Sequence, residues 1–257
     1  MTTEKVSSKQ AVKTEQISIR TKDGDCRAWL SIPEGEGPWP AAILYMDGLA
    51  IRPALLEMGE RLATGGYVVL LPDMFYRAGP YAPLDPATVF AGGNVREALG
   101  HLMGSTDNKR AAEDSEAFIA YLDTRSEVKG PKIGTTGYCM GGGISLTVAG
   151  TYPDRIAAAA SFHGGNLATD DPLSPHLLAP KMKARVLVAG ADQDHGYPPE
   201  MAERLDKALT DAGVDHVCEI YPGALHGWTM TDFPVYNEAA AERHWAELFG
   251  LFGETLG

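Results

Sequence analysis

Short apolar runs recur along the chain, separated by stretches long enough to form helices. Several of these runs are apolar without interruption, as is typical of parallel strands covered on both faces. Ile17 and Ile19 alternate with polar residues, which indicates one further strand at an edge of the sheet. The continuous runs predict strands at 27–32, 41–46, 67–72, 132–137, 156–162, 184–190 and 216–221.

The segments between the strands have helical character. The stretch 53–66 begins with Pro53 and ends in glycines, which are the usual start and stop signals of a helix. In 108–125 the apolar positions recur at helical spacing. Further helices are predicted at 142–152, 198–213 and 237–252. Strands that alternate with helices predict an α/β fold whose mostly parallel, doubly wound sheet has helices on both faces.

The chain of 257 residues shows no linker between compositionally distinct halves, so we expect one domain. Residues 1–16 are polar and predict a tail, which leaves 17–257 as the domain. The longest irregular piece, 75–95, is rich in proline, glycine and aromatic residues. Long loops in compact domains are usually functional or disordered, and the aromatics favour a loop packed over one end of the sheet.

Charge and cysteine usage exclude several classes of protein. The formal net charge is -12, and no block of Lys and Arg offsets it, so nucleic acid is not an expected partner. No apolar stretch is long enough to span a membrane, and the N-terminus lacks the apolar region of a secretory signal. The three cysteines form neither a disulfide framework nor a metal-binding pattern. We expect a cytoplasmic protein without metal or cofactor.

The segment "GYCMGGG" at 137–143 places Cys139 between glycines, after a strand and before a helix. This pattern fits a nucleophile elbow, in which an abrupt strand-to-helix turn displays the reactive side chain. The turn directs the N–H of Met140 into the site at the positive end of the helix, where a thiolate or an oxyanion is favoured. The alternative is a small buried thiol at a close contact between helix and sheet.

The order of later residues favours the nucleophile. Asp192 and Asp194 follow the strand at 184–190, and His226 follows the strand at 216–221. A nucleophile, an acid and a histidine in this order, each after a strand, are the arrangement of α/β-hydrolases. The carboxyl ends of parallel strands are also where open α/β sheets place their sites.

Four segments resemble the dienelactone hydrolase family, a group of carboxymethylenebutenolidase-like α/β-hydrolases. They are "GYCMGG" at the elbow, "DQDHGYP" at 192–198, "PGALHGW" at 222–228 and "PDMFYR" at 72–77. The resemblance implies an α/β-hydrolase fold without a large cap domain and a Cys139–His226–Asp194 triad that cleaves small esters or lactones. Asp194 is favoured over Asp192 because it precedes Pro198 by the family's spacing.

The resemblance also implies roles around the triad. Gly48 becomes the second oxyanion donor beside Met140. Asp47 occupies the place of a family glutamate near the thiol, where a carboxylate can hold the thiol protonated until substrate arrives. The equally weighted alternative is that Asp47 caps the helix near Pro53 or braces Arg52.

One departure concerns substrate recognition. Family members that cleave dienelactones carry an arginine four residues after the histidine, and this chain has Met230 there. Arg52, Arg77 and Arg96 are the candidate substitutes, although each is equally suited to bracing a loop.

Two aromatic residues are further candidates for the pocket. Trp228 is expected to shape it, whereas His163 is expected either to line it or to pack in the core. Cys26 and Cys218 lie within strand patterns and are expected to be inert core thiols. The expected activity is ester hydrolysis through a thioester, with acyl transfer, hydrolysis of a larger ester, or ligand binding without turnover as alternatives.

Overall fold

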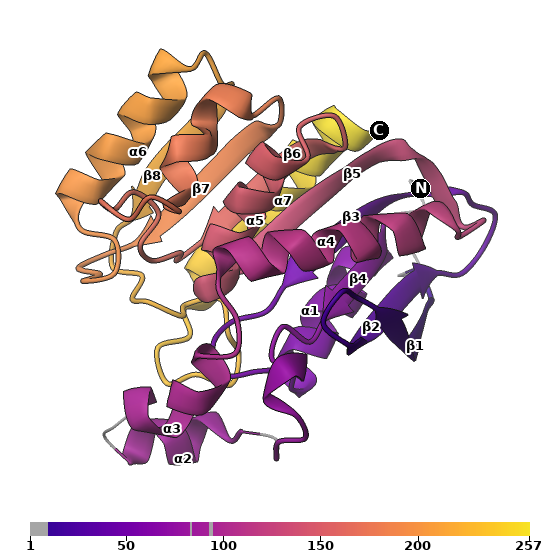
Figure 1. Ribbon diagram of the computed structural model, residues 1–257, viewed down its shortest axis with the longest axis horizontal. Helices are drawn as coiled ribbons and strands as arrows, with labels where there is room; N and C mark the ends of the chain where they lie inside the picture. Colours follow the sequence, from indigo (N-terminus) through magenta and orange to yellow (C-terminus); the bar gives the residue numbers. More distant parts are fainter. Residues whose placement is uncertain (1–9, 83, 93–94) are drawn as a thin grey trace, which may run out of the picture.

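The computed structural model describes residues 10–82, 84–92 and 95–257 of the chain. Its core is one eight-stranded sheet in the order β1-β2-β4-β3-β5-β6-β7-β8 (Figure 1). The strands β1 and β2 form an antiparallel hairpin, β2 pairs antiparallel with β4, and the remaining neighbours pair parallel. Their bounds are β1 Val12–Arg20, β2 Asp25–Pro33, β3 Trp39–Tyr45, β4 Val68–Pro72, β5 Val128–Tyr138, β6 Ile156–Phe162, β7 Arg185–Ala191 and β8 His216–Tyr221.

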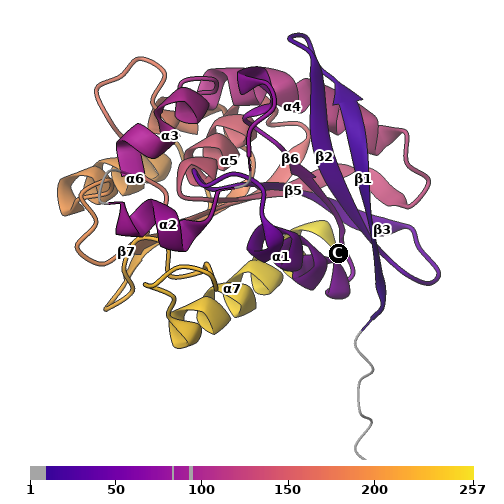
Figure 2. The same cartoon turned by 90° about the horizontal axis from the view of Figure 1, so that it is seen from below.

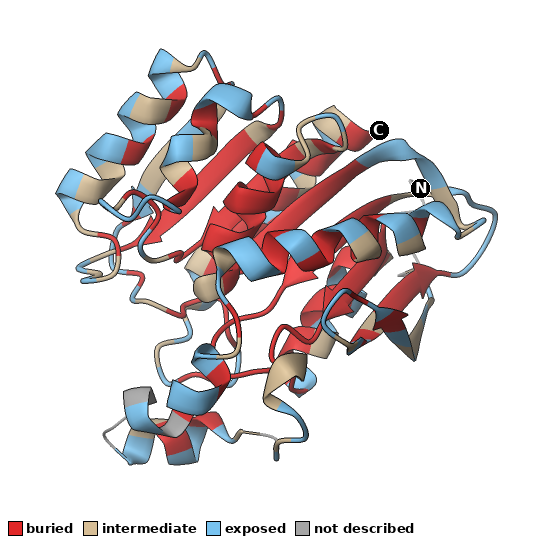
Figure 3. Ribbon diagram, viewed as in Figure 1, coloured by how far each residue is buried: buried red, intermediate tan, exposed pale blue. Residues whose placement is uncertain are grey.

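The sheet is mostly parallel and doubly wound, as the hydrophobic pattern predicts. Helices α1 (Pro53–Thr64) and α7 (Glu238–Leu256) cover one face, while α4 (Asn108–Asp123), α5 (Met140–Thr151) and α6 (Pro199–Asp211) cover the other (Figure 2). The central strands are buried on both faces (Figure 3), which explains why their sequences are continuously apolar.

The structure contains strand residues ahead of residue 17, the predicted start of the domain. The first strand begins at Val12, because its polar side chains alternate with half-buried ones along an edge strand and do not look apolar in sequence. Of the predicted polar tail 1–16, residues 1–9 lie outside the described residues. Within the described part of the chain, no large cap domain interrupts the fold, and no helix is both long and apolar enough to cross a membrane.

The segment 75–95 is not one irregular loop. It contains the short 3-10 helix η1 (Tyr76–Ala78) and helix α2 (Pro86–Ala91), and α3 (Val95–Met103) follows directly. The Asp85 carboxylate accepts hydrogen bonds from the N–H groups of Ala87 and Thr88, so it caps α2, which begins with a proline. The second 3-10 helix, η2 (Pro175–Lys181), packs against α5 and α6.

Candidate active site

Cys139 lies on the turn between β5 and α5. Its backbone has φ 54° and ψ -116°, a conformation that side-chain-bearing residues rarely adopt. Such strain persists only where the surrounding structure enforces it, and it is characteristic of functional sites. The turn leaves the sulfur half-buried at the carboxyl end of the sheet, at the start of a helix.

The glycines around Cys139 are required by contact rather than by flexibility. A Cβ atom on Gly137 would lie 1.8 Å from the carbonyl oxygen of Gly141, and one on Gly141 would lie 2.3 Å from that of Tyr45. A Cβ on Gly142 would meet the Ser161 hydroxyl at 2.3 Å. The "GYCMGGG" motif therefore lets the start of α5 approach β3 and β6 closely enough to form the turn.

Asp194 and His226 meet although they come from different loops. Asp194 follows β7 and His226 follows β8, and the His226 Nδ1 lies 2.6 Å from the Asp194 Oδ2. The other Asp194 oxygen accepts a hydrogen bond of 2.8 Å from the Gly196 N–H, which fixes the carboxylate. Asp192 instead accepts a hydrogen bond from the Gly223 N–H at 2.9 Å and braces the loop before His226.

The electrostatics of this pair favour a charged imidazole. Burial alone would lower the pKa of His226, but the hydrogen bond to Asp194 and the adjacent Cys139 sulfur outweigh it and raise the pKa to about 10. The pKa of Asp194 is lowered, because its bonds to His226 and Gly196 outweigh the opposing effect of burial. The site is thus suited to an imidazolium held between a carboxylate and a sulfur.

The His163 side chain accepts a hydrogen bond from the backbone of the nucleophile elbow. The N–H of Cys139 donates to the Phe162 carbonyl oxygen at 3.1 Å and to the His163 Nδ1 at 3.2 Å. Because Nδ1 accepts, Nε2 carries the proton and donates to the Thr229 hydroxyl at 2.7 Å. The side chain is completely buried, and burial together with the neighbouring His226 lowers its pKa well below the usual value. His163 is therefore a neutral packing residue rather than part of an open pocket wall.

The two expected oxyanion donors lie in suitable local settings. Met140 is the first residue of α5, where a backbone N–H has no carbonyl partner within the helix. Gly48 lies on a turn after β3. A Cβ built on Gly48 would come within 3.4 Å of the Met103 sulfur and 3.8 Å of the Leu99 side chain, so α3 covers this turn with apolar groups.

Asp47 is committed to an ion-pair network. Its two carboxylate oxygens each accept a hydrogen bond of 2.8 Å from Arg52, whose guanidinium also bonds Asp232 at 2.6 Å. Arg52 further lies over the ring of Phe233, which packs against Phe90 of α2. These contacts match the bracing alternative for Asp47 and Arg52, and they tie the loop after β3 to the segment after His226.

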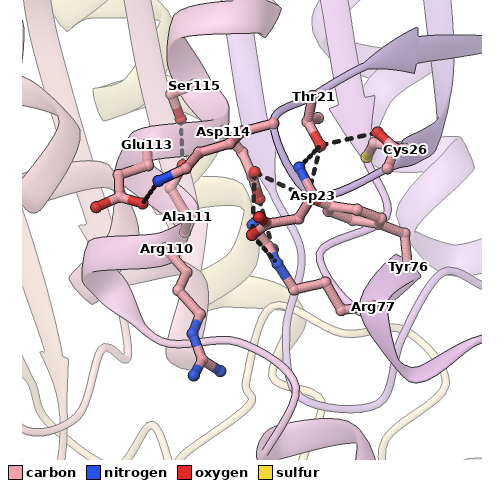
Figure 4. A network of polar contacts seen from close by, with 12 residues as sticks. Thr21, Asp23, Cys26, Tyr76, Arg77, Arg110, Ala111, Glu113, Asp114 and Ser115 are labelled. Carbon is pink, nitrogen blue, oxygen red and sulfur yellow. Dashed lines mark hydrogen bonds and ion pairs between the residues drawn. The ribbon is translucent and has the colours of Figure 1, made fainter.

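Arg77 lies in a second polar network, together with Asp23, Tyr76 and Asp114 (Figure 4). Its guanidinium makes two hydrogen bonds of 2.7 Å to the buried Asp114 of α4 and a further one of 2.8 Å to Asp23. The Tyr76 hydroxyl donates to the same Asp114 carboxylate. These contacts correspond to a loop-bracing arginine. The side chain of Arg96 lies outside the described residues.

Trp228 and Met230 are both completely buried. The Trp228 ring stacks on Tyr221 and meets His163 edge-on, so it packs behind the histidine loop instead of facing an open pocket. A large surface groove of about 830 Å³ lies elsewhere, against α1 and α7, and contains none of the candidate site residues.

Sequence reasoning missed the acidic partners of these arginines. For Asp114 the sequence does indicate a buried position, because the residue lies four positions before Phe118 and eight before Leu122. This spacing places it on the buried face of α4. A charged residue on an apolar helix face requires a buried partner. Asp232 carried no comparable signal, because it lies in an irregular segment.

Comparison with known proteins gives a consistent result. Residues 26–256 match the dienelactone hydrolase family. The chain is 27% identical over 231 residues to a carboxymethylenebutenolidase from Pseudomonas putida, covering 89% of this chain and 91% of that relative. It is also 27% identical over 252 residues to a candidate carboxymethylenebutenolidase from Synechocystis sp., covering 95% and 98% of the two chains.

Solved structures share the fold. The candidate dienelactone hydrolase of Klebsiella pneumoniae superposes with a TM-score of 0.80 at 22% identity, over 95% of this chain and 99% of that one. A dienelactone hydrolase-like promiscuous phosphotriesterase from metagenomic libraries superposes with a TM-score of 0.77, also at 22% identity, over 96% and 100% of the two chains. At these identities the likeness establishes the architecture.

Proposed function

The chain belongs to the dienelactone hydrolase family, and we propose that it hydrolyses small esters or lactones through a thioester formed on Cys139. The observation that carries this proposal is the position of His226, which bonds Asp194 and is near enough to Cys139 for that sulfur to raise the imidazole pKa. A nucleophile, a base and an orienting acid in contact are the signature of nucleophilic catalysis.

The first half-reaction forms the acyl-enzyme. The Cys139 thiolate attacks the carbonyl carbon, a C–S bond forms, and the carbonyl electron pair moves onto oxygen. The N–H groups of Met140 and Gly48 stabilise this oxyanion. As the intermediate collapses, the C–O bond to the leaving group breaks and the imidazolium of His226 donates its proton to the departing oxygen. Asp194 keeps the imidazole oriented throughout.

The second half-reaction releases the acid. His226, now neutral, takes a proton from water, and the resulting hydroxide attacks the thioester carbonyl. The C–S bond breaks, and the thiolate is restored beside the imidazolium. A thiolate expels an alkoxide or enolate more readily than an amide nitrogen, which favours esters and lactones over peptides.

The surroundings favour a small and largely uncharged acyl group. Leu99 and Met103 of α3 lie over the Gly48 turn, and Met230 replaces the arginine that family members use for a substrate carboxylate. Arg52 and Arg77 are both occupied by internal carboxylates. We therefore expect neutral short-chain esters to be cleaved more efficiently than a carboxylated lactone.

Steady-state assays of short p-nitrophenyl esters and a cis-dienelactone test the proposal. Cys139→Ala should reduce turnover to background with the thermal unfolding midpoint near that of the wild type, since alanine and cysteine tolerate the turn equally. Mass spectrometry of the quenched wild-type reaction should detect an acyl group on the Cys139 peptide.

Thiol alkylation provides an internal control. Activity should decline in step with iodoacetamide labelling of Cys139, while the completely buried Cys26 stays unlabelled. Full turnover by Cys139→Ala, or ligand-dependent thermal stabilisation of the wild type without any turnover, would overturn the proposal.

A further inference from the structure

A second group of chemically reactive side chains lies at the edge of the sheet. Asp206, His216 and Cys218 place a carboxylate oxygen, an imidazole nitrogen and a sulfur within 4.8 Å of one another. His216 and Cys218 belong to β8, before the loop that carries His226. The group is therefore separate from the candidate active site, which forms at the carboxyl end of the strands.

The fold explains why these three residues meet. His216 and Cys218 are two positions apart on a strand, so their side chains share one face. That face is covered by α6, which contributes Asp206. The spacing of the three residues in the sequence matches no metal-binding motif. Linear spacing alone therefore predicts no metal site here, because the residues meet only in the folded chain.

A cavity of about 220 Å³ adjoins the group. It is lined by Asp206, Cys218, Glu203 and Tyr197, among others. The Tyr197 side chain is 2% exposed, and its hydroxyl has no hydrogen-bond partner among the described residues. A buried hydroxyl without a partner is costly, and in native proteins it usually indicates a missing ligand or solvent molecule. A residue that lines the cavity beside the cluster thus carries an unsatisfied polar group.

The imidazole is already oriented as a metal ligand would be. The His216 Nδ1 lies 2.8 Å from the Val214 carbonyl oxygen, which only accepts, so Nδ1 carries a proton. The Nε2 atom faces the Asp206 Oδ1 at 3.2 Å. Two groups with lone pairs approach this closely only when a proton or a cation lies between them. A carbonyl that accepts from Nδ1–H, so that the lone pair of Nε2 is directed at a cation, is the usual support of a metal-binding histidine.

We propose that Asp206, His216 and Cys218 form a binding site for a zinc-type divalent cation. One carboxylate oxygen, Nε2 and the thiolate supply three ligands, which leaves the fourth position of a tetrahedral zinc site to solvent or a further donor. Zinc binds this mixture of donors at about 2.0–2.3 Å, which a set of atoms already within 4.8 Å can reach with small side-chain movements. The site would join α6 to β8.

A thiol binds zinc as the thiolate, so each bound ion must release the sulfur proton of Cys218 into solvent. The competing explanation is a simple ion pair between a protonated His216 and the largely exposed Asp206, which needs no metal.

Titration of the full chain with Zn²⁺ against a chromophoric chelator distinguishes these explanations. Because Cys139 and His226 are themselves able to bind a thiophilic cation, the titration uses Cys139→Ala as the parent. The parent should bind one equivalent of Zn²⁺ and release at least one proton. With Co²⁺ as the probe, it should show sulfur-to-cobalt charge-transfer absorption.

Adding Cys218→Ser to this parent should abolish the charge-transfer band and weaken binding at least tenfold, and adding His216→Gln should weaken binding similarly. The matched control is Asp211→Asn, which removes an exposed carboxylate from the same helix and should bind as the parent does. Failure of the parent to bind Zn²⁺, or unchanged binding in both ligand variants, would overturn the proposal. Because His216→Gln retains the size and polarity of the side chain, it provides a folded test if Cys218→Ser is unstable.

Discussion

The His226 Nδ1 lies 2.6 Å from the Asp194 Oδ2, although 32 positions separate the two residues in sequence. The carboxylate is almost buried, whereas the imidazole side chain is 37% exposed. The carboxylate is thus shielded from water, while the imidazole remains partly accessible to solvent. This asymmetry determines how the pair responds to pH and to substitution.

The stability of the fold should depend on the His226 proton. The pKa of His226 rises from about 6.5 in an unfolded chain to about 10 in the folded protein. The folded state therefore binds this proton more tightly, and the resulting stabilisation is complete below pH 6.5 and lost as pH rises through 10. Urea unfolding from pH 6 to pH 11 should show a decline in the wild type that is reduced in His226→Gln. Parallel curves would contradict the assignment.

Asp194→Asn should lower kcat by about a thousandfold or more, because an amide neither fixes the imidazole tautomer nor stabilises its cation. Asp192→Asn is the matched control, since its side chain bonds only the Gly223 N–H among the described contacts and asparagine retains an acceptor oxygen. Its kcat should stay within about twofold of the wild type. Equal losses in the two variants would show that loop bracing, rather than orientation of His226, dominates.

Arg77→Ala should act on stability rather than on substrate affinity. It leaves the buried Asp114 carboxylate without its principal cation, which should lower the free energy of unfolding by about 3 kcal/mol. Arg20→Ala breaks an exposed pair with Asp25 and should cost less than about 1 kcal/mol. The KM for a neutral ester should be unchanged in both variants, and a selective rise in KM for Arg77→Ala would restore this residue as a substrate contact.

Asp47→Asn separates two roles for that carboxylate. If Asp47 only braces Arg52, the variant should lose about 3 kcal/mol of stability, while Cys139 reacts with hydrogen peroxide at the wild-type rate. If the carboxylate acts directly on the thiol, the oxidation rate should change. The comparison is Asp232→Asn, which removes the other carboxylate from Arg52. An altered oxidation rate in Asp47→Asn alone would favour direct modulation.

The sheet was predictable because burial on both faces leaves a continuous apolar signal, as in β3 and β6. The start of β1 was not, since an edge strand with half-exposed polar residues resembles a tail. Helix α2 was hidden because the proline and glycine around it signal a loop, while its cap depends on a single carboxylate. A cap of this kind can be recognised only in the folded structure, because it depends on the path of the backbone.

The elbow was predictable because its close contacts demand glycine, and glycine is visible in sequence. The partners of the arginines were not, because Asp114 and Asp232 reach Arg77 and Arg52 only through tertiary packing. The same holds for Asp206, His216 and Cys218, which belong to a helix and a strand that meet in the folded chain. The support that His163 gives to Cys139 likewise depends on backbone geometry that no motif encodes.

Among the residues that the structure describes, strand β8 pairs only with β7, and the loop that holds His226 begins where β8 ends. An edge strand detaches at a lower free energy than the strands between which Cys139 is anchored. On warming, hydrolytic activity should therefore be lost while the centre of the sheet is still folded. On cooling, the activity should return, because only the edge of the sheet has to refold. The thermal stability of the active site therefore depends on the edge strand β8 and not on the central strands of the sheet.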